Sequence, residues 1–274
     1  MGYASAVSVR NIKWASPHEK RSFFIWYLSY GWIRLKGKNV AQALDKVFPR
    51  SVADQKVGFA RYNFLLSDRG TVLDDLLIYR MAEEEFMIVV NAGTIDSDFE
   101  RIKKLLPSDI SLVNESNDTG KLDLQGPRTL EIMKKLGFNP SDLPTGYKWT
   151  KTTVKGIPTL LSRTGYTGEL GFEFYVAANK VGELWDYLLS FPEVKPAGLG
   201  SRDTLRLEVG YPLYGHEMDT NTTPVEAGFS PVLGLEKRSG FMCEQILKDP
   251  AKKTKNLIGI VLDGRRAVRQ VNKV

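Results

Sequence analysis

The first half of the chain alternates between strand-like and helix-like patterns of hydrophobic and polar positions. Hydrophobic residues at every second position predict half-buried strands, and helical spacing of such residues predicts helices with one buried face. Internal repeats and low-complexity tracts are absent, so we expect a mixed α and β protein. The expected strands are 32–35, 61–66, 72–80 and 86–91, and the expected helices are 40–47 and 96–106, the latter capped by Asp96 and ended by Pro107.

The second half repeats this mixture over longer stretches. The expected strands are 121–124, 159–162, 172–176 and 256–262, and the expected helices are 128–136, 178–190 and 201–210, the last with Ser201 as its N-cap. The strand at 256–262 leads into Asp263-Gly264, a hairpin signal. Only 265–274 follow, and a lone hairpin is not independently stable. We therefore expect the sequence to end inside a β-rich domain.

Size and composition narrow the class of protein. The chain has 274 residues, 42% hydrophobic and 26% charged, which suits a large core and about two domains. The single cysteine, Cys243, excludes an intramolecular disulfide and a multi-cysteine metal site. No apolar run approaches the ~20 residues of a membrane span, and the N-terminus lacks the order of a signal peptide. We expect a cytoplasmic protein.

The net charge leaves the class of partner open. A formal charge of +6 suits an anionic partner such as nucleic acid, a folate tail or an acidic carrier protein. The basic residues are scattered, without the aromatic-studded basic pattern of an RNA-binding sheet. We therefore expect no nucleic-acid partner.

The stretch from Ser162 to Glu173 carries the most suggestive chemistry. Its glycines, Gly165, Gly168 and Gly171, let the backbone turn tightly and approach a flat ligand. A tyrosine and two glutamates in the same stretch supply one ring and two acceptors. Such a composition suits a heterocycle site, and it equally suits a hairpin loop with solvated carboxylates.

Several strings in fixed order closely resemble the glycine-cleavage T-protein (aminomethyltransferase) superfamily, which also includes folate-dependent demethylases and an iron–sulfur assembly branch. The resemblance runs from about Gly31 to Arg269. The strings that carry it are GTVLDDLL at 70–77, VVNA at 89–92, LQGP at 124–127, GYTGELGFE at 165–173, PAGLGSRDTLRLE at 196–208, PLYGHE at 212–217 and TPVEAG at 223–228.

The resemblance implies roles for individual residues. Asp75 matches the catalytic carboxylate, which in the family orients the folate amine and stabilises cationic character as the aminomethyl carbon leaves sulfur. Glu173 matches the pterin-binding glutamate, because a carboxylate can accept two parallel N–H bonds. The remaining residues implied in cofactor binding are Tyr62, Val89, Asn91, Tyr166 and Arg202, with Glu169 and Tyr214 as further loop candidates.

The resemblance also implies an architecture and a reaction. The expected fold is α+β, a multi-domain ring around a central folate pocket, with mixed and antiparallel sheets and an incomplete C-terminal β-barrel domain. The expected domains are 1–32 with 119–249, an inserted 33–118, and a fragment at 250–274. The implied reaction moves a one-carbon unit from an aminomethyl-lipoyl carrier protein to tetrahydrofolate and releases ammonia. We expect no metal, and a monomer or weak dimer.

Three departures from the family pattern keep alternatives open. The aspartate and histidine of the family's first string are absent near Trp26 to Gly31, and residues that complete the last domain are missing. Cys243 lies in a string that partly resembles the iron–sulfur assembly branch. A folate-dependent assembly factor, a demethylase and an inactive folate-binding remnant therefore remain alternatives to the transferase.

Overall fold

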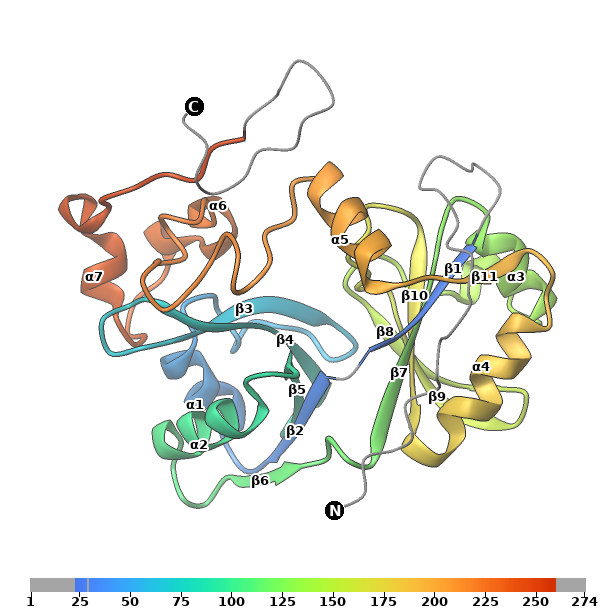
Figure 1. The fold of residues 1–274 in the computed structure, drawn as a ribbon. Helices are drawn as coiled ribbons and strands as arrows, with labels where there is room; N and C mark the ends of the chain where they lie inside the picture. Colours follow the sequence, from blue (N-terminus) through green and yellow to red (C-terminus); the bar gives the residue numbers. More distant parts are fainter. Residues whose placement is uncertain (1–22, 29, 260–274) are drawn as a thin grey trace.

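A computed structural model describes residues 23–28 and 30–259. Two sheets form its centre, and their strands are mostly antiparallel (Figure 1). The five-stranded sheet has the order β3-β4-β5-β2-β6, and the six-stranded sheet has the order β11-β1-β7-β10-β9-β8. The strands are β1 Phe23–Leu28, β2 Tyr30–Lys36, β3 Ala60–Leu66, β4 Val72–Ala82, β5 Glu85–Asn91, β6 Ser111–Asn114, β7 Thr119–Gln125, β8 Trp149–Val154, β9 Ile157–Ser162, β10 Gly171–Ala177 and β11 Val194–Pro196.

Helices cover the outer face of each sheet (Figure 1). α1 and α2 lie against the five-stranded sheet, and α3 and α4 lie against the six-stranded sheet. The α-helices are α1 Val40–Val47, α2 Ile95–Leu105, α3 Thr129–Lys135, α4 Val181–Leu189, α5 Leu199–Glu208, α6 Ser230–Leu233 and α7 Glu244–Lys248, and the short 3-10 helices are η1 Pro140–Asp142, η2 Ala178–Lys180, η3 Leu235–Lys237 and η4 Pro250–Lys252.

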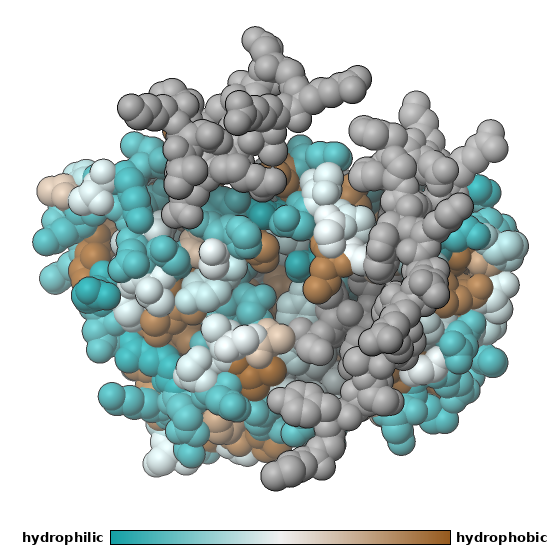
Figure 2. All heavy atoms as spheres, viewed as in Figure 1, coloured by the Kyte–Doolittle hydropathy of each residue, from teal (hydrophilic) through white to brown (hydrophobic). Residues whose placement is uncertain are grey.

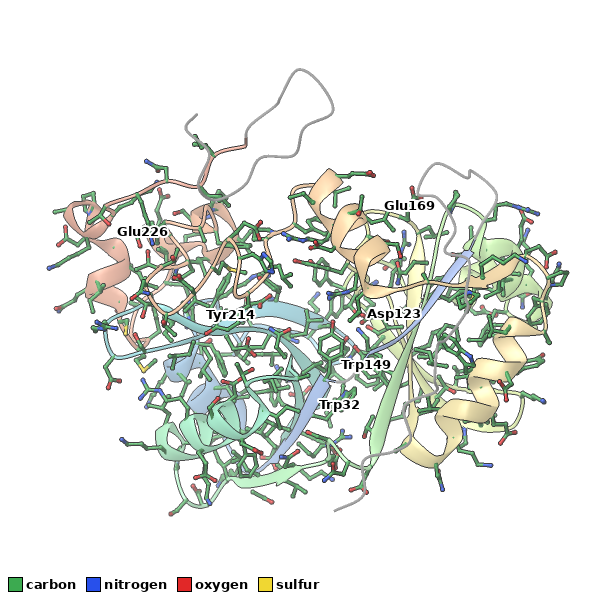
Figure 3. All side chains as sticks on the ribbon, viewed as in Figure 1. Trp32, Asp123, Trp149, Glu169, Tyr214 and Glu226 are labelled. Atoms are coloured by element: carbon green, nitrogen blue, oxygen red, sulfur yellow. The ribbon has the colours of Figure 1, made fainter. Side chains whose placement is uncertain are left out.

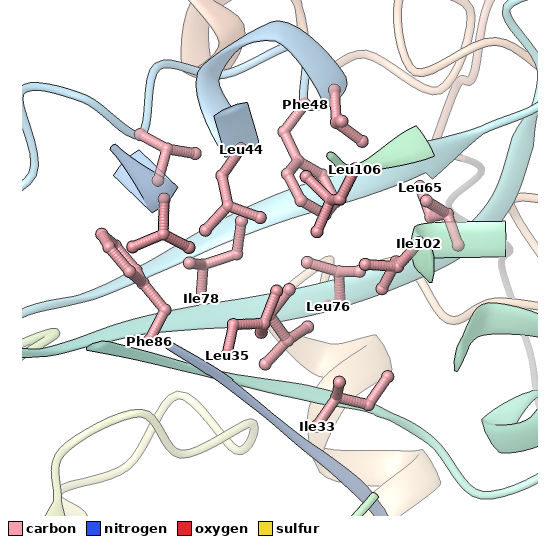
Figure 4. Close-up of a cluster of buried hydrophobic side chains, with 14 of the residues drawn as sticks. Ile33, Leu35, Leu44, Phe48, Leu65, Leu76, Ile78, Phe86, Ile102 and Leu106 are labelled. Atoms are coloured by element: carbon pink, nitrogen blue, oxygen red, sulfur yellow. The ribbon is translucent and has the colours of Figure 1, made fainter. Parts of the chain in front are cut away.

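Alternation along β4 decides what each sheet face contacts. Leu76 and Ile78 point into the core beneath α1 and α2, which Figure 4 shows in close-up. Leu77 and Tyr79 point the other way, toward the six-stranded sheet. Successive side chains of a strand face opposite sides, so one strand lines both layers. Adjacent residues Asp74 and Asp75 are separated in the same way.

The inner faces of the two sheets meet in an apolar and aromatic layer, which we call the seam. Trp32, Tyr79 and Val89 come from the five-stranded sheet, and Tyr175 comes from β10. The ring of Trp32 meets that of Tyr175 edge-on, with 6.1 Å between centroids. The seam therefore fixes the position of one sheet against the other.

A third packed region follows α5 and covers β3. Phe64 and Leu66 of β3 are fully buried there. Their contacts come from Met218, Phe241 and Leu247, all in the last described part of the chain. This region contains α6 and α7 and lies beside the five-stranded sheet (Figure 1).

Most expected elements are present within one or two residues, with several corrections. The N-cap of α2 is Thr94 rather than Asp96, and the N-cap of α5 is Gly198 rather than Ser201, because both helices begin earlier than expected. The expected helix at 178–190 opens with the 3-10 turn η2. Residues 256–259 form no strand and are exposed; their expected hairpin continues outside the described residues.

One face of the described structure is mostly polar. On the face drawn in Figure 2, hydrophilic side chains predominate and hydrophobic ones form small, separate patches. Within 23–28 and 30–259, no helix is both long and apolar enough to cross a bilayer.

Candidate active site

Asp75 stands on the inner face of β4 in a hydrogen-bonded trio. The hydroxyl of Tyr62 donates to Asp75 Oδ2 at 2.8 Å, and the side-chain amide of Asn91 donates to Asp75 Oδ1 at 3.0 Å. Tyr62 reaches this position from β3, and Asn91 from the end of β5. Three of the residues expected at the site are therefore brought together by neighbouring strands.

The environment of Asp75 makes its carboxyl less acidic than usual. Burial and the nearby charge of Asp74 raise its pKa to about 6, although the bonds from Tyr62 and Asn91 act in the opposite direction. A carboxyl group with this pKa is mostly ionised at neutral pH, and it can gain or lose a proton at a pH close to neutral. Such tuning is typical of a catalytic acid or base.

Asp74 is a structural carboxylate on the opposite face of β4. It is fully buried and accepts bonds from the backbone N–H of Asn91 at 3.0 Å and from the Thr94 hydroxyl at 2.9 Å. Asp98 of α2 lies beside it, and burial together with Asp74 raises the pKa of Asp98 to about 9. Asp98 is therefore protonated at neutral pH.

Tyr166 and Arg202 form a second group. The Arg202 guanidinium lies 4.6 Å from the centre of the Tyr166 ring and donates to the Tyr30 hydroxyl at 2.8 Å. The Tyr166 hydroxyl donates to the Pro212 carbonyl. The charge of Asp75 contributes, after burial, to a raised pKa of Tyr166, so this group lies near the Asp75 trio.

The glycines before β10 allow close contact with protein side chains. A Cβ atom on Gly165 would lie 2.4 Å from the Gln125 side chain, and one on Gly168 would lie 2.3 Å from Val209. Gly168 also has φ of +73°, which side chains disfavour. Within the described structure these glycines therefore serve the packing of the loop against β7 and the end of α5.

Glu173 lies at the centre of a buried polar network on the six-stranded sheet. Lys121 donates to its Oε1, and Thr164 and Tyr175 donate to its Oε2, the latter at 2.8 Å. Burial alone would raise the pKa of Glu173, but Lys121 and these hydrogen bonds hold it below its usual value. Glu173 is thus an ionised carboxylate with protein partners on both oxygens.

Sequence reasoning missed the partners that build this network. Lys121 and Asp123 alternate with leucines on β7, a pattern that normally indicates a solvated face. No feature of the sequence indicated this pairing. In the structure β7 and β10 are neighbouring antiparallel strands with Asp123 opposite Glu173, and this register brings Lys121, Asp123 and Glu173 together. Tyr79 was missed because a tyrosine in a strand usually indicates only packing.

The other expected residues occupy separate places. Val89 is buried in the seam. Glu169 is exposed in the loop before β10, and Tyr214 packs against the third region (Figure 3). Cys243 is half-buried with its thiol directed to the Ser67 carbonyl, and burial raises its pKa. A thiol of raised pKa is a poor nucleophile, so nothing here favours the assembly-factor alternative.

Comparison with known proteins identifies the family. The family model of the GCVT N-terminal domain matches residues 27–237. An aminomethyltransferase of Halothermothrix orenii is 38% identical over 239 residues, covering 86% of this chain and 67% of the relative. One from Alkaliphilus metalliredigens is 38% identical over 242 residues, covering 86% and 66%. The chain thus spans about two thirds of the length of these relatives.

A solved structure gives the same result for the fold. The crystal structure of the glycine cleavage system aminomethyltransferase T from Bartonella henselae superposes with a TM-score of 0.75 at 29% identity. The match covers 84% of this chain and 63% of that one. The chain therefore belongs to the GCVT N-terminal domain family, the family of the glycine cleavage system aminomethyltransferases.

Proposed function

We propose that this chain carries the tetrahydrofolate site of an aminomethyltransferase. In that reaction a one-carbon unit passes from an aminomethyl-lipoyl carrier protein to tetrahydrofolate, and ammonia is released. The observation that carries the proposal is Asp75, a carboxylate held by Tyr62 and Asn91 on the inner face of β4 with a pKa raised to about 6. Membership of the family supports the same assignment.

The fit of this chain to a reduced pterin rests on its donor and acceptor set. Asp75 and Asn91 offer polar atoms from one sheet, and Arg202 and Tyr166 offer a cation and a ring from the other side of the site. Tyr62, Val89 and Glu173 complete the proposed cofactor-binding group.

Asp75 performs the chemical role in this proposal. Tetrahydrofolate supplies the nucleophilic nitrogen when it is bound. Asp75 is ionised at neutral pH, so its carboxylate can orient an N–H group and stabilise positive charge that develops beside it. Tyr62 and Asn91 fix the orientation of both carboxylate oxygens, which limits the reorganisation needed during the reaction.

The finer architecture belongs to the same proposal. We place the two sheets and the region after α5 in a ring around the folate site, with residues 33–118 as an inserted domain. A lipoylated carrier protein is the proposed partner, and the protein acts as a monomer or weak dimer.

Calorimetric titration with tetrahydrofolate tests the proposal. We expect saturable binding by the wild-type chain, and nearly unchanged binding by Asp75→Asn, which keeps the shape of the side chain. Ammonia release from an aminomethyl-lipoyl carrier should fall by about 10²–10⁴-fold in Asp75→Asn, the usual contribution of a positioned acid or base. The matched control is Asp186→Asn on the exposed face of α4.

Each result separates binding from turnover. Failure of the folded wild-type chain to bind tetrahydrofolate contradicts the proposed function. Binding without ammonia release favours an inactive folate-binding remnant. An Asp75→Asn variant as active as Asp186→Asn would remove Asp75 from the mechanism.

A further inference from the structure

The outer edge of β3 brings an arginine and a tyrosine together. β3 is the terminal strand of the five-stranded sheet, so every second residue directs its backbone groups away from β4. The N–H of Ala60 donates to the Tyr147 carbonyl at 2.8 Å, and Nη1 of Arg50 donates to the Tyr62 carbonyl at 3.2 Å. Two residues of a strand span about 7 Å. Arg50 and Tyr147 are therefore neighbours along one edge.

Arg50 is a half-buried cation without an anion of its own. The Asn63 side chain fixes its backbone, accepting from the Arg50 N–H at 3.1 Å and donating to its carbonyl at 2.8 Å. No carboxylate in the described part of the chain forms an ion pair with the guanidinium, since the nearby Asp54 pairs with Arg61 at 2.5 Å. Burial and the like charge of Arg61 lower the pKa of Arg50. An anion bound here would offset both effects.

Tyr147 is held beside Arg50 in a backbone conformation that bulky residues seldom adopt. Its φ is +57°, in the left-handed region. Hydrogen bonds on both sides keep it there, because its carbonyl accepts from Ala60 and its N–H donates to the Arg163 carbonyl at 3.0 Å. Tyr147 thus joins β3 to the end of β9, and 52% of the residue is exposed. Such strained residues recur at ligand-binding sites.

The edge of β3 adjoins the proposed folate site. Tyr62 accepts from Arg50 through its carbonyl and donates to Asp75 through its hydroxyl, so one residue belongs to both places. Burial raises the pKa of Tyr147, and the charges of Arg50 and Glu173 act on it in opposite directions, so both groups lie near this hydroxyl. Arg50 and Tyr147 therefore form the exposed end of a site whose buried end holds Glu173.

We propose that Arg50 binds a carboxylate at the end of the ligand opposite the pterin, beside the ring of Tyr147. This inference rests on the proposed function, because it assigns a specificity residue at the same site. The ligand class is a reduced pterin whose aromatic linker ends in a dicarboxylate, which on tetrahydrofolate is the glutamate of the tail. A guanidinium pairs with a carboxylate through two parallel hydrogen bonds. Nε and Nη2 of Arg50 have no partner among the described residues and can supply them.

The test compares two ligands that differ only in the charge of the tail. Tetrahydrofolate and its diamide, in which amides replace both glutamate carboxylates, are titrated calorimetrically into the wild-type chain and Arg50→Gln. We expect Arg50→Gln to lose about 10-fold in affinity for tetrahydrofolate, the effect of one charged hydrogen bond, and little for the diamide. Raising the ionic strength should weaken the preference for tetrahydrofolate more in the wild type than in Arg50→Gln. Arg69→Gln, at an exposed arginine, is the control with the same change of charge.

The pair of ligands separates recognition of the tail from a structural effect. Equal losses for both ligands in Arg50→Gln would mean that Arg50 only supports Tyr62, and would overturn the inference. A preference that survives in Arg50→Gln and disappears in Arg202→Gln would assign the tail to Arg202 instead. A wild-type chain that binds both ligands equally, or an equal effect of Arg69→Gln, would also overturn the inference and leave the proposed function intact. A wild-type chain that binds neither ligand would overturn both.

Discussion

At the scale of single residues, the sequence Asp74-Asp75 shows how a strand gives two identical side chains different properties. Asp74 points toward α2, where the Asn91 backbone and Thr94 donate to it. Asp75 points toward the seam, where burial and the charge of Asp74 raise its pKa to about 6. The alternation of strand faces therefore places one carboxylate among donors beside α2 and the next in the seam, where its pKa is raised.

The raised pKa of Asp75 predicts a pH-dependent effect of Asp75→Asn on stability. The folded pKa of about 6 exceeds the ordinary aspartate value of 3.8, so this carboxyl stabilises the fold fully below about pH 4 and progressively less up to pH 6. In urea unfolding, the free energy of unfolding of Asp75→Asn relative to that of the wild type should increase between pH 4 and pH 6. The increase should be at most about 3 kcal/mol, and the difference should stay constant above pH 6.

Asp186→Asn, on the exposed face of α4, is the control for this comparison. Parallel stability profiles of the wild type and Asp75→Asn between pH 4 and 7 would contradict the raised pKa.

At the scale of elements, a single hydroxyl on β4 connects three segments of the six-stranded half. Tyr79 is fully buried, and its hydroxyl lies 3.2 Å from Ser162 Oγ, 2.9 Å from Thr164 Oγ1 and 2.9 Å from the Tyr175 hydroxyl. These partners belong to β9, the following loop and β10. Because Thr164 and Tyr175 also hold Glu173, this contact links the sheet interface to the ion network.

The Tyr79→Phe variant should therefore be destabilised by about 1–3 kcal/mol, since buried hydroxyls of its partners lose a hydrogen bond. Thermal or urea unfolding measures the change. Tyr187→Phe on α4 is the control, because that ring packs outside the seam beneath Lys155. A Tyr79→Phe variant as stable as Tyr187→Phe would show that the seam is held by apolar packing alone.

Hydrophobic spacing predicted α1 at its observed bounds and predicted β5 one residue shorter than observed. Both elements bury a regular set of side chains, along one stripe of the helix or on the faces of the strand. Hydrophobic spacing missed β1 and β8, and also β6, whose residues are mostly exposed, and β11, which has only 3 residues. The Asp75 trio was found through family strings. Lys121 and Asp123 were not predicted to be buried, because alternation in the sequence shows that a strand has two different faces. It does not show which element covers each face. Their burial depends on the second sheet.

At the scale of the whole molecule, Arg238 anchors the third region to the five-stranded half. Its guanidinium donates to Asp45 Oδ2 at 2.7 Å and to the Asp45 and Phe48 carbonyls at 2.6 and 3.1 Å. The guanidinium also lies 5.1 Å from the centre of the Phe241 ring. One side chain therefore satisfies carbonyls at the end of α1 and fixes a segment about 190 residues later.

Replacing this anchor should loosen the third region selectively. In Arg238→Ala, amide hydrogens of 230–250 should exchange faster while those of β7 and β10 stay protected, and overall stability should fall by about 3 kcal/mol. The exposed Arg69→Ala serves as the control. Unchanged exchange in 230–250 would mean that the apolar contacts with β3 hold this region without Arg238.

The pairing of β1 also sets an order of events during protein synthesis. The five-stranded sheet takes all its strands from residues 30–114, so it can fold once that stretch has left the ribosome. β1 is made before any of them, yet Phe24 pairs with Gln125 and Phe23 with Val194, about 100 and about 170 residues later. In a nascent chain, β1 is therefore made first but pairs with β7 and β11 only after the five-stranded sheet can be complete. The six-stranded sheet, which carries Glu173 and Asp123, is completed only after the five-stranded sheet, which carries Asp75.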